Sequence, residues 1–374
     1  MNSLNCIEIS RTALVHNFDC CRRLSGNGAV MAMVKADGYG HGMIDCARIF
    51  AERGAVAFGV AEAVEGVALR GAGITVPILV LAGVVPQTLP LIVDAGLTPV
   101  VVDPSILAEL SRLAGLRGLT VGLHLKLDAG MGRQGTLPAD FLALVRAVRS
   151  FANLRLDGVM AHLPLADDRR SANSAQVVAN FTATTALLAR EVPGRCCLHL
   201  ANSGGLFYVA GAQLDMVRPG ISLYGYYPDG PAGRAAAASP LLQPVMRFTT
   251  QVIQVRQVPA GTGLGYNHLF TTARPSTIAL LPVGYDDGYL RCLSNKAQVL
   301  IGGQRAPVVG RISMNLTMVD VTDLRPVAVG DQAVLLGRQG DEEITADDLA
   351  GWMDTISYEV LCLLGKLNQR LMVA

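Results

Sequence analysis

The segment Ala29-Val30-Met31-Ala32-Met33-Val34 is followed at once by Lys35-Ala36-Asp37-Gly38-Tyr39-Gly40-His41-Gly42. An uninterrupted apolar run that ends in a glycine-rich turn predicts a strand buried on both faces. A helical pattern follows over residues 42–53, and a second apolar run covers residues 55–60. Strand, helix and strand in this order form the unit from which parallel α/β folds are built.

The same unit repeats along the first part of the chain. We expect strands at residues 30–34, 55–60, 78–81, 98–102, 121–127, 157–162, 198–201 and 216–222. Helices are expected between them, including residues 42–53, 61–72, 105–113, 138–150 and 175–190. About eight such repeats predict a closed (β/α)₈ barrel of the TIM type. The doubly wound sheet is the main alternative, but no GxGxxG turn follows the first strand.

The pattern changes near residue 228, where Pro228-Asp229-Gly230-Pro231-Ala232-Gly233-Arg234 and the alanines after it indicate a loop and a domain boundary. Beyond it, β-rich runs occur at residues 246–258, 277–283, 297–301, 306–312, 317–321 and 332–336, with helical patterns at 344–354 and 358–367. We therefore expect an α/β chain whose barrel, residues 1–230, precedes a smaller, mainly β domain, residues 231–374.

The composition favours small-molecule chemistry. With a net charge of +1 and 16% charged residues over 374 positions, the chain offers no electrostatic case for nucleic acid or an anionic membrane. Its most apolar stretch, residues 74–85, is broken by Pro77 and is too short to span a bilayer. The start of the chain has no basic region followed by an apolar block, and the eight cysteines lack CxxC spacing. A cytoplasmic location, reduced thiols and no metal cluster are expected.

Polar residues follow many of the predicted strands at their carboxyl ends, where the active site of such a barrel lies. They are Lys35 after the first strand, Lys126, Asp128 and Arg133 after the fifth, His162 at the sixth, Asn202 and Ser203 at the seventh, and Arg218 in the eighth. Packing does not require so many polar side chains at one end of a barrel. We expect them to form a catalytic rim.

The last two of these loops suggest a phosphate site. They read Ala201-Asn202-Ser203-Gly204-Gly205 and Arg218-Pro219-Gly220-Ile221-Ser222. Ser203 is expected to cap a short helix, and the glycines free backbone N–H groups for an anion; an ordinary N-cap and a Pro-Gly turn are the alternative. Because a P-loop lysine motif is missing, a phosphorylated cofactor or sugar is favoured over ATP. A lysine opposite such a site suggests pyridoxal phosphate, whose aldehyde reacts with amines.

Five segments resemble the alanine racemase family, in the family's order and across nearly the whole chain. They are Val34–Gly42, Lys126-Leu127-Asp128-Ala129-Gly130-Met131-Gly132-Arg133-Gln134-Gly135, Met216-Val217-Arg218-Pro219-Gly220-Ile221-Ser222-Leu223-Tyr224-Gly225, Leu281-Pro282-Val283-Gly284-Tyr285-Asp286-Asp287-Gly288-Tyr289, and Gly310-Arg311-Ile312-Ser313-Met314. Tyr358-Glu359 completes the likeness.

The resemblance implies a pyridoxal 5′-phosphate enzyme that interconverts L-alanine and D-alanine through an external aldimine. Lys35 would hold the cofactor and act as base on one face, while Tyr266 from the other subunit serves the opposite face. Two bases on opposite faces are what inversion of a carbon centre needs. The resemblance also implies a homodimer with shared active sites, and a role in supplying or using D-alanine.

Further roles come from the same resemblance. Arg218 would face the pyridine nitrogen and, with His162, tune Tyr266. The phosphate ligands would be Tyr39, Ser203 (beside Asn202), Tyr358 and the backbone of Gly220 and Ile221. Arg133 and the backbone N–H of Met314 from the partner subunit would contact the substrate carboxylate, with Tyr285 lining the same pocket. Lys126 would be carbamylated, and Asp167 and Arg291 would line an access channel.

Departures from the family pattern keep the substrate range open. Asn315 stands where aspartate is common, Ala129 replaces threonine, and Leu163-Pro164 follow His162 in place of a phenylalanine start. A serine racemase or one of broader specificity therefore remains an alternative. A related decarboxylase and a non-catalytic pyridoxal-phosphate-binding barrel are two others; Tyr266 and the Lys126–Arg133 pair favour the racemase.

Overall fold

Eight parallel strands form the larger part of the protein, for which we describe a computed structural model covering residues 3–192, 194–236 and 241–374. The strands are β2 (Ala29–Met33), β3 (Ala57–Val60), β4 (Ile78–Val80), β5 (Thr98–Val101), β6 (Val121–Lys126), β7 (Leu154–Met160), β8 (Cys197–His199) and β9 (Met216–Val217). They pair in the order β8-β7-β6-β5-β4-β3-β2-β9. The Asp215 N–H donates to Leu198 O and the Arg218 N–H to Ala201 O, which joins the two ends of the sheet. The predicted (β/α)₈ barrel is confirmed.

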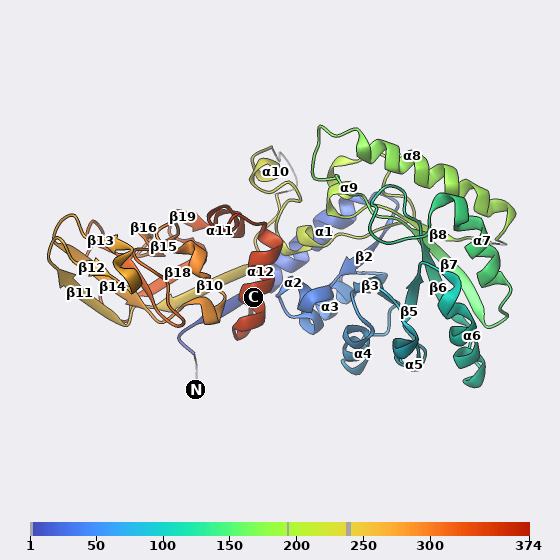
Figure 1. The fold of residues 1–374 in the computed structure, drawn as a ribbon, viewed down its shortest axis with the longest axis horizontal. Coiled ribbons are helices and arrows are strands. Elements are labelled where there is room, and N and C mark those ends of the chain that lie inside the picture. Colours follow the sequence, from blue (N-terminus) through green and yellow to red (C-terminus); the bar gives the residue numbers. More distant parts are fainter. Residues whose placement is uncertain (1–2, 193, 237–240) are drawn as a thin grey trace. The chain divides into compact units, whose positions relative to one another are not determined.

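Helices surround these strands (Figure 1). They are α3 (Met43–Glu52), α4 (Ala63–Gly71), α5 (Leu89–Asp94), α6 (Leu107–Leu116), α7 (Pro138–Arg149) and α8 (Asn173–Ala186), with α1 (Arg11–Leu24), α9 (Ser203–Tyr208) and α10 (Pro231–Ala236) outside the repeat. Helix α7 illustrates the pattern: Pro138 opens it, and Phe141, Leu144, Val145 and Val148 are buried at helical spacing. Among the described helices, none is at once long and apolar enough to cross a membrane.

A second unit is built mainly of antiparallel strands. One sheet has the order β16-β15-β18-β10-β1-β20, from β16 (Gln304–Pro307), β15 (Gln298–Ile301), β18 (Gln332–Gln339), β10 (Met246–Gln251), β1 (Cys6–Ser10) and β20 (Arg370–Val373), and β19 (Glu342–Ile344) pairs with β18. Another comprises β11 (Gln254–Val258), β14 (Ser276–Leu281) and β17 (Thr317–Asp320), and β12 (Gly263–Leu264) pairs with β13 (Phe270–Thr271). Helices α11 (Ala346–Met353) and α12 (Ser357–Leu367) follow near the end.

The second unit draws on three parts of the chain: residues 1–13, 39–42 and 243–374, while residues 14–38 and 43–242 form the barrel unit. Strand β1 pairs with β10 and with β20, although neither β1 nor β20 stood out in the sequence. Both are short strands whose partners lie hundreds of residues away, so local pattern carries little signal for them. A single cut between residues 230 and 231 does not describe this arrangement.

Three sequence expectations were wrong in detail. The predicted strand 216–222 ends at Val217, because Pro219 and Gly220 lead into a 3₁₀ turn at Ile221–Tyr224. The run 246–258 is two strands in different sheets, β10 and β11. Residues 231–236, expected as loop, form helix α10, which Pro231 opens; the alanines at 237 and 238 lie outside the described residues.

Candidate active site

The backbone after β2 is held in an unusual turn. Ala36, Asp37, Gly38 and Tyr39 have φ angles of 53°, 52°, 63° and 54°, so the short element α2 (Lys35–Tyr39) is left-handed. A left-handed conformation costs an L-residue about 1–2 kcal/mol. Such strain persists where surrounding contacts over-determine it, and it concentrates at functional sites. The turn carries the exposed Lys35 at its first position.

Glu65 of helix α4 holds this turn from the side. Its Oε1 accepts from the Ala36 N–H at 2.8 Å, and its Oε2 accepts from the Ala61 N–H at 2.7 Å, just beyond β3. One carboxylate therefore ties the Lys35 turn to the end of the neighbouring strand. Sequence reasoning missed Glu65; its only signal was an acidic residue in the first turn of the helix after a buried strand.

Replacing Glu65 with alanine should lower the free energy of unfolding by about 1–3 kcal/mol, because the backbone N–H groups of Ala36, Ala61 and Glu62 lose their acceptor. Glu109→Ala is the matched control, since within the described part of the chain Glu109 pairs only with Arg112 on the same exposed helix face. Urea unfolding measures both variants. Equal stability of the two would contradict the anchoring role.

The loop after β6 is also preformed. Asp128 Oδ1 accepts from the backbone N–H groups of Gly130, Met131 and Gly132 at 3.0, 2.8 and 3.1 Å. Burial alone would raise the pKa of Asp128, but these bonds outweigh it and lower the pKa. The loop therefore presents the exposed Arg133 from a backbone organised around one carboxylate.

Lys126 lies at the end of β6, nearly buried. Its Nζ donates to Gln134 Oε1 at 2.7 Å, and Gln134 Nε2 donates to Ala82 O at 3.2 Å. Burial, and then the charges of Arg133 and Arg218, lower the pKa of Lys126 to about 8. Gln134 lay within a quoted motif but received no role from the sequence; its pairing with a lysine eight residues earlier depends on the loop conformation.

The pKa of His162 reflects the positive charges around it. Burial, and then the charges of Arg218, Arg133, Lys126 and Lys35 in that order, lower its pKa to about 3. Asn202 Nδ2 lies 3.5 Å from His162 Nε2 and donates to Leu163 O at 3.3 Å. The cationic residues predicted at the first, fifth and eighth strands thus act on the imidazole at the end of the sixth. This is a strongly positive site, suited to an anionic ligand.

Two hydroxyls and two backbone N–H groups converge beyond β8 and β9. Asn202, rather than Ser203 as expected, caps helix α9, by accepting from the Gly205 N–H at 2.9 Å. Ser203 Oγ instead accepts from the Gly220 N–H at 2.9 Å and the Ser222 N–H at 3.4 Å. Ser222 Oγ is buried, with no hydrogen-bond partner among the described residues. This cradle, next to the buried Ile221, fits a phosphate group.

Arg218 is buried and points its guanidinium at neutral acceptors. Nη2 donates to Ala161 O at 2.6 Å and to Leu200 O at 3.1 Å, and Nη1 lies 3.2 Å from His199 Nδ1. Burial lowers its pKa to about 10, so the group remains charged at neutral pH. No role for His199 was predicted from the sequence.

The other predicted site residues belong to the second unit. The rings of Tyr39 and Tyr358 lie 6.1 Å apart, and burial raises the pKa of Tyr39. The Tyr285 N–H donates to Ser313 O, next to Met314, at 3.2 Å. Tyr266 is 66% exposed, on a turn in which Asn267 and His268 are left-handed. The structure therefore groups nine of the predicted residues in the barrel unit (Lys35, Lys126, Arg133, His162, Asn202, Ser203, Arg218, Gly220, Ile221) and five in the second (Tyr39, Tyr266, Tyr285, Met314, Tyr358).

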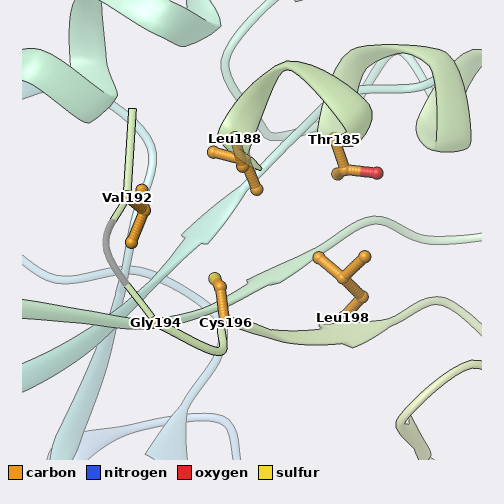
Figure 2. Close-up of a pocket in the computed structure, with 6 residues that line it drawn as sticks. All are labelled: Thr185, Leu188, Val192, Gly194, Cys196 and Leu198. Carbon is orange, nitrogen blue, oxygen red and sulfur yellow. The ribbon is translucent and has the colours of Figure 1, made fainter. Parts of the chain in front are cut away.

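A small cavity of about 140 Å³ lies elsewhere on the barrel (Figure 2). Its lining is Thr185, Leu188, Val192, Gly194, Cys196 and Leu198. Gly194 and Cys196 precede β8, whereas Asn202 and Ser203 follow it. The cavity is therefore separate from the carboxyl-end site.

Comparison with known proteins identifies the family to which both parts of the chain belong. Residues 9–228 match the family model "Alanine racemase, N-terminal domain" and residues 245–372 match "Alanine racemase, C-terminal domain". The alanine racemases of Halothermothrix orenii and Symbiobacterium thermophilum are 39% and 42% identical to this chain, each over 95% of it and 93% of the relative.

Solved structures agree as well. The alanine racemase of Streptomyces lavendulae superposes with a TM-score of 0.93 at 31% identity, covering 100% of this chain and 98% of that one. That of Bartonella henselae, determined with covalently bound pyridoxal phosphate, gives 0.89 at 29% identity with both chains fully covered. The chain belongs to the alanine racemase family, whose members are isomerases that use pyridoxal phosphate.

Proposed function

We propose that this protein interconverts L-alanine and D-alanine, with pyridoxal phosphate held by Lys35. The observation that carries the proposal is the set of cations acting on His162 beside the Ser203 cradle. Both ligands of the reaction carry an anionic group, the phosphate of the cofactor and the carboxylate of the amino acid. The structure of the alanine racemase of Bacillus anthracis, 29% identical over all of this chain, was determined with bound L-Ala-P.

Phosphate binding is assigned to Ser203, the Gly220 and Ile221 backbone and, from the second unit, Tyr39 and Tyr358. The Gly220 N–H donates to Ser203 Oγ in this structure. A phosphate oxygen would accept a hydrogen bond of the same kind from this N–H. The raised pKa of Tyr39 keeps its hydroxyl protonated, and therefore a donor.

Proton transfer is assigned to two side chains. Pyridoxal phosphate, when bound, supplies an electron sink that makes the substrate Cα–H acidic. Lys35 Nζ removes or returns the proton on one face, and Tyr266 Oη from a partner subunit acts on the other. The exposure of Tyr266, 66%, supports a role completed by a second chain. The functional unit is therefore proposed to be a homodimer.

Arg218 is assigned to the cofactor's ring nitrogen. A guanidinium keeps its proton at neutral pH, even with its pKa lowered to about 10. A donor that does not transfer its proton leaves the ring a weaker electron sink. The proton then returns quickly to Cα, which favours racemisation over transamination.

The substrate carboxylate is assigned to Arg133 and to the Met314 backbone N–H of a partner subunit, with Tyr285 lining the pocket. Asn315 follows Met314, and its Nδ2 lies 3.4 Å from Asp286 Oδ2. Because Asn315 stands where the family commonly has aspartate, L-serine should be tested as a substrate beside L-alanine. Conversion of either amino acid by the purified holoenzyme, read by chiral chromatography, tests the proposed function; absence of both D-products overturns it.

Lys126 is proposed to be carbamylated, which gives Arg133 an anionic neighbour. Its uncharged Nζ would attack CO₂, forming an N–C bond and releasing a proton. With a pKa of about 8, about a tenth of the amine is uncharged at pH 7, against about one part in three thousand at the ordinary value of 10.5.

Labelling with ¹³C-bicarbonate should therefore give a carbamate resonance that grows from pH 7 to pH 8.5, as the amine loses its proton. The resonance should be missing from Lys126→Met. A wild-type protein that gives no such resonance and has an unmodified intact mass would contradict the carbamate.

A further inference from the structure

Two buried histidines continue inward from Arg218. His199 Nδ1 faces Arg218 Nη1 at 3.2 Å, and His199 Nε2 faces His124 Nδ1 at 2.8 Å. His124 lies on β6 and His199 on β8, with β7 between them. In a (β/α)₈ barrel the side chains of one interior layer come from alternate strands. The fold thus brings the two rings into one layer, with centroids 4.9 Å apart.

The chemistry of the donors assigns both tautomers. An arginine guanidinium only donates hydrogen bonds, so His199 Nδ1 must be the acceptor. A neutral His199 then carries its proton on Nε2 and donates it to His124 Nδ1. His124 is in turn neutral, with its own proton on Nε2.

The surroundings keep both rings uncharged. Burial is the main cause that lowers the pKa of His124 to about 4; the Asp157 carboxylate opposes this shift and the Arg218 charge adds to it. Burial, Arg218 and His124 hold the pKa of His199 well below its ordinary value. A proton on His124 Nδ1 would face the Nε2–H of His199, and the other His199 tautomer would turn an N–H toward Arg218.

We propose that His124 is a positioning residue for Arg218, acting by accepting the His199 Nε2–H and so locking His199 as the tautomer that accepts from the guanidinium. The inference rests on the proposed function, in which Arg218 faces the cofactor's ring nitrogen. The two acceptors of Arg218 Nη2, Ala161 O and Leu200 O, are backbone oxygens. The only side-chain acceptor that the described residues give Arg218 is His199, so the tautomer of His199 decides whether Nη1 has an acceptor.

Two variants separate positioning from packing. His124→Leu fills the layer but removes the acceptor, whereas His124→Asn places a carbonyl oxygen near the former Nδ1. For His124→Leu we expect kcat for alanine racemisation to fall about tenfold, with KM changed less than about twofold. Losses of this size occur where a hydrogen-bond partner that orients a functional side chain is removed. His124→Asn should recover most of kcat. Equal kcat values for the wild type and both variants would overturn the inference.

Histidine ring ¹⁵N shifts provide a readout without turnover. In [¹⁵N]histidine-labelled holoenzyme at pH 7, His124 and His199 should both be neutral with the proton on Nε2, and in His124→Leu the His199 signal should move toward the other tautomer. A charged His199, or one with its proton on Nδ1 in the wild type, would overturn the inference even if His124→Leu fails to fold. If the expected tautomers occur in a protein that does not racemise alanine, the proposed function fails and the inferred effect on kcat fails with it.

Discussion

Replacing Lys35 with alanine is expected to abolish racemisation, with a loss of at least about 10⁴-fold in kcat. The variant loses the amine that binds the cofactor and the base on one face of the substrate, and a positioned general base alone contributes about 10²–10⁴-fold. Initial rates with L-alanine, measured by chiral chromatography at saturating pyridoxal phosphate, give the effect. Borohydride reduction followed by peptide mass analysis should find the cofactor on the wild-type peptide that carries Lys35, and not in the variant.

Lys296→Ala is the control for this experiment. Lys296 is exposed in the second unit, and its Nζ donates to Trp352 O at 3.4 Å. Its replacement should leave both the rate and the attached mass unchanged. Cofactor mass that stays on the Lys35→Ala protein with activity intact would contradict the assignment of Lys35.

Replacing Tyr266 with phenylalanine is expected to slow the two directions of the proton transfer unequally. The variant lacks the hydroxyl that serves one face, so removal of the proton from one enantiomer should fall about 10²–10⁴-fold, while Lys35 still exchanges the proton of the other. Exchange of the α-proton in deuterated water, followed by NMR separately for L-alanine and D-alanine, measures this. Mild, equal losses for both enantiomers would contradict the two-base scheme.

Mixing chains tests whether Tyr266 acts across subunits. If each site combines Lys35 of one chain with Tyr266 of another, a Lys35→Ala chain and a Tyr266→Phe chain refolded together should form some sites with both wild-type groups. Activity above the sum of the separate variants is the expected result. A mixed sample with no gain would contradict the shared site.

The barrel could be predicted from the sequence because each strand and helix shows its own local pattern. The buried run before Lys35 and the periodic face of α7 are examples. Strands β1 and β20 could not be predicted, since their pairing depends on partners far along the chain. Pro219 and Gly220 did signal the early end of β9, but the apolar residues after them outweighed that signal.

For the candidate site, the residue types and the strand ends that carry them were predictable, whereas the hydrogen-bond partners of these residues were not. The place of Ser203 near Gly220 followed from loops at neighbouring strand ends. Its role did not follow, because Asn202 takes the cap and turns the Ser203 hydroxyl to the other loop. Glu65, Gln134 and His199 were missed for the same reason. Their importance comes from hydrogen bonds across elements, which no local pattern encodes.

The most direct test of the whole account is incubation of the purified holoenzyme with L-alanine in deuterated water. The account predicts that D-alanine appears and that it carries deuterium at Cα, since the proton is removed on one face and replaced from the other. Formation of CO₂ and the corresponding amine, or recovery of L-alanine with its α-proton intact, would contradict it.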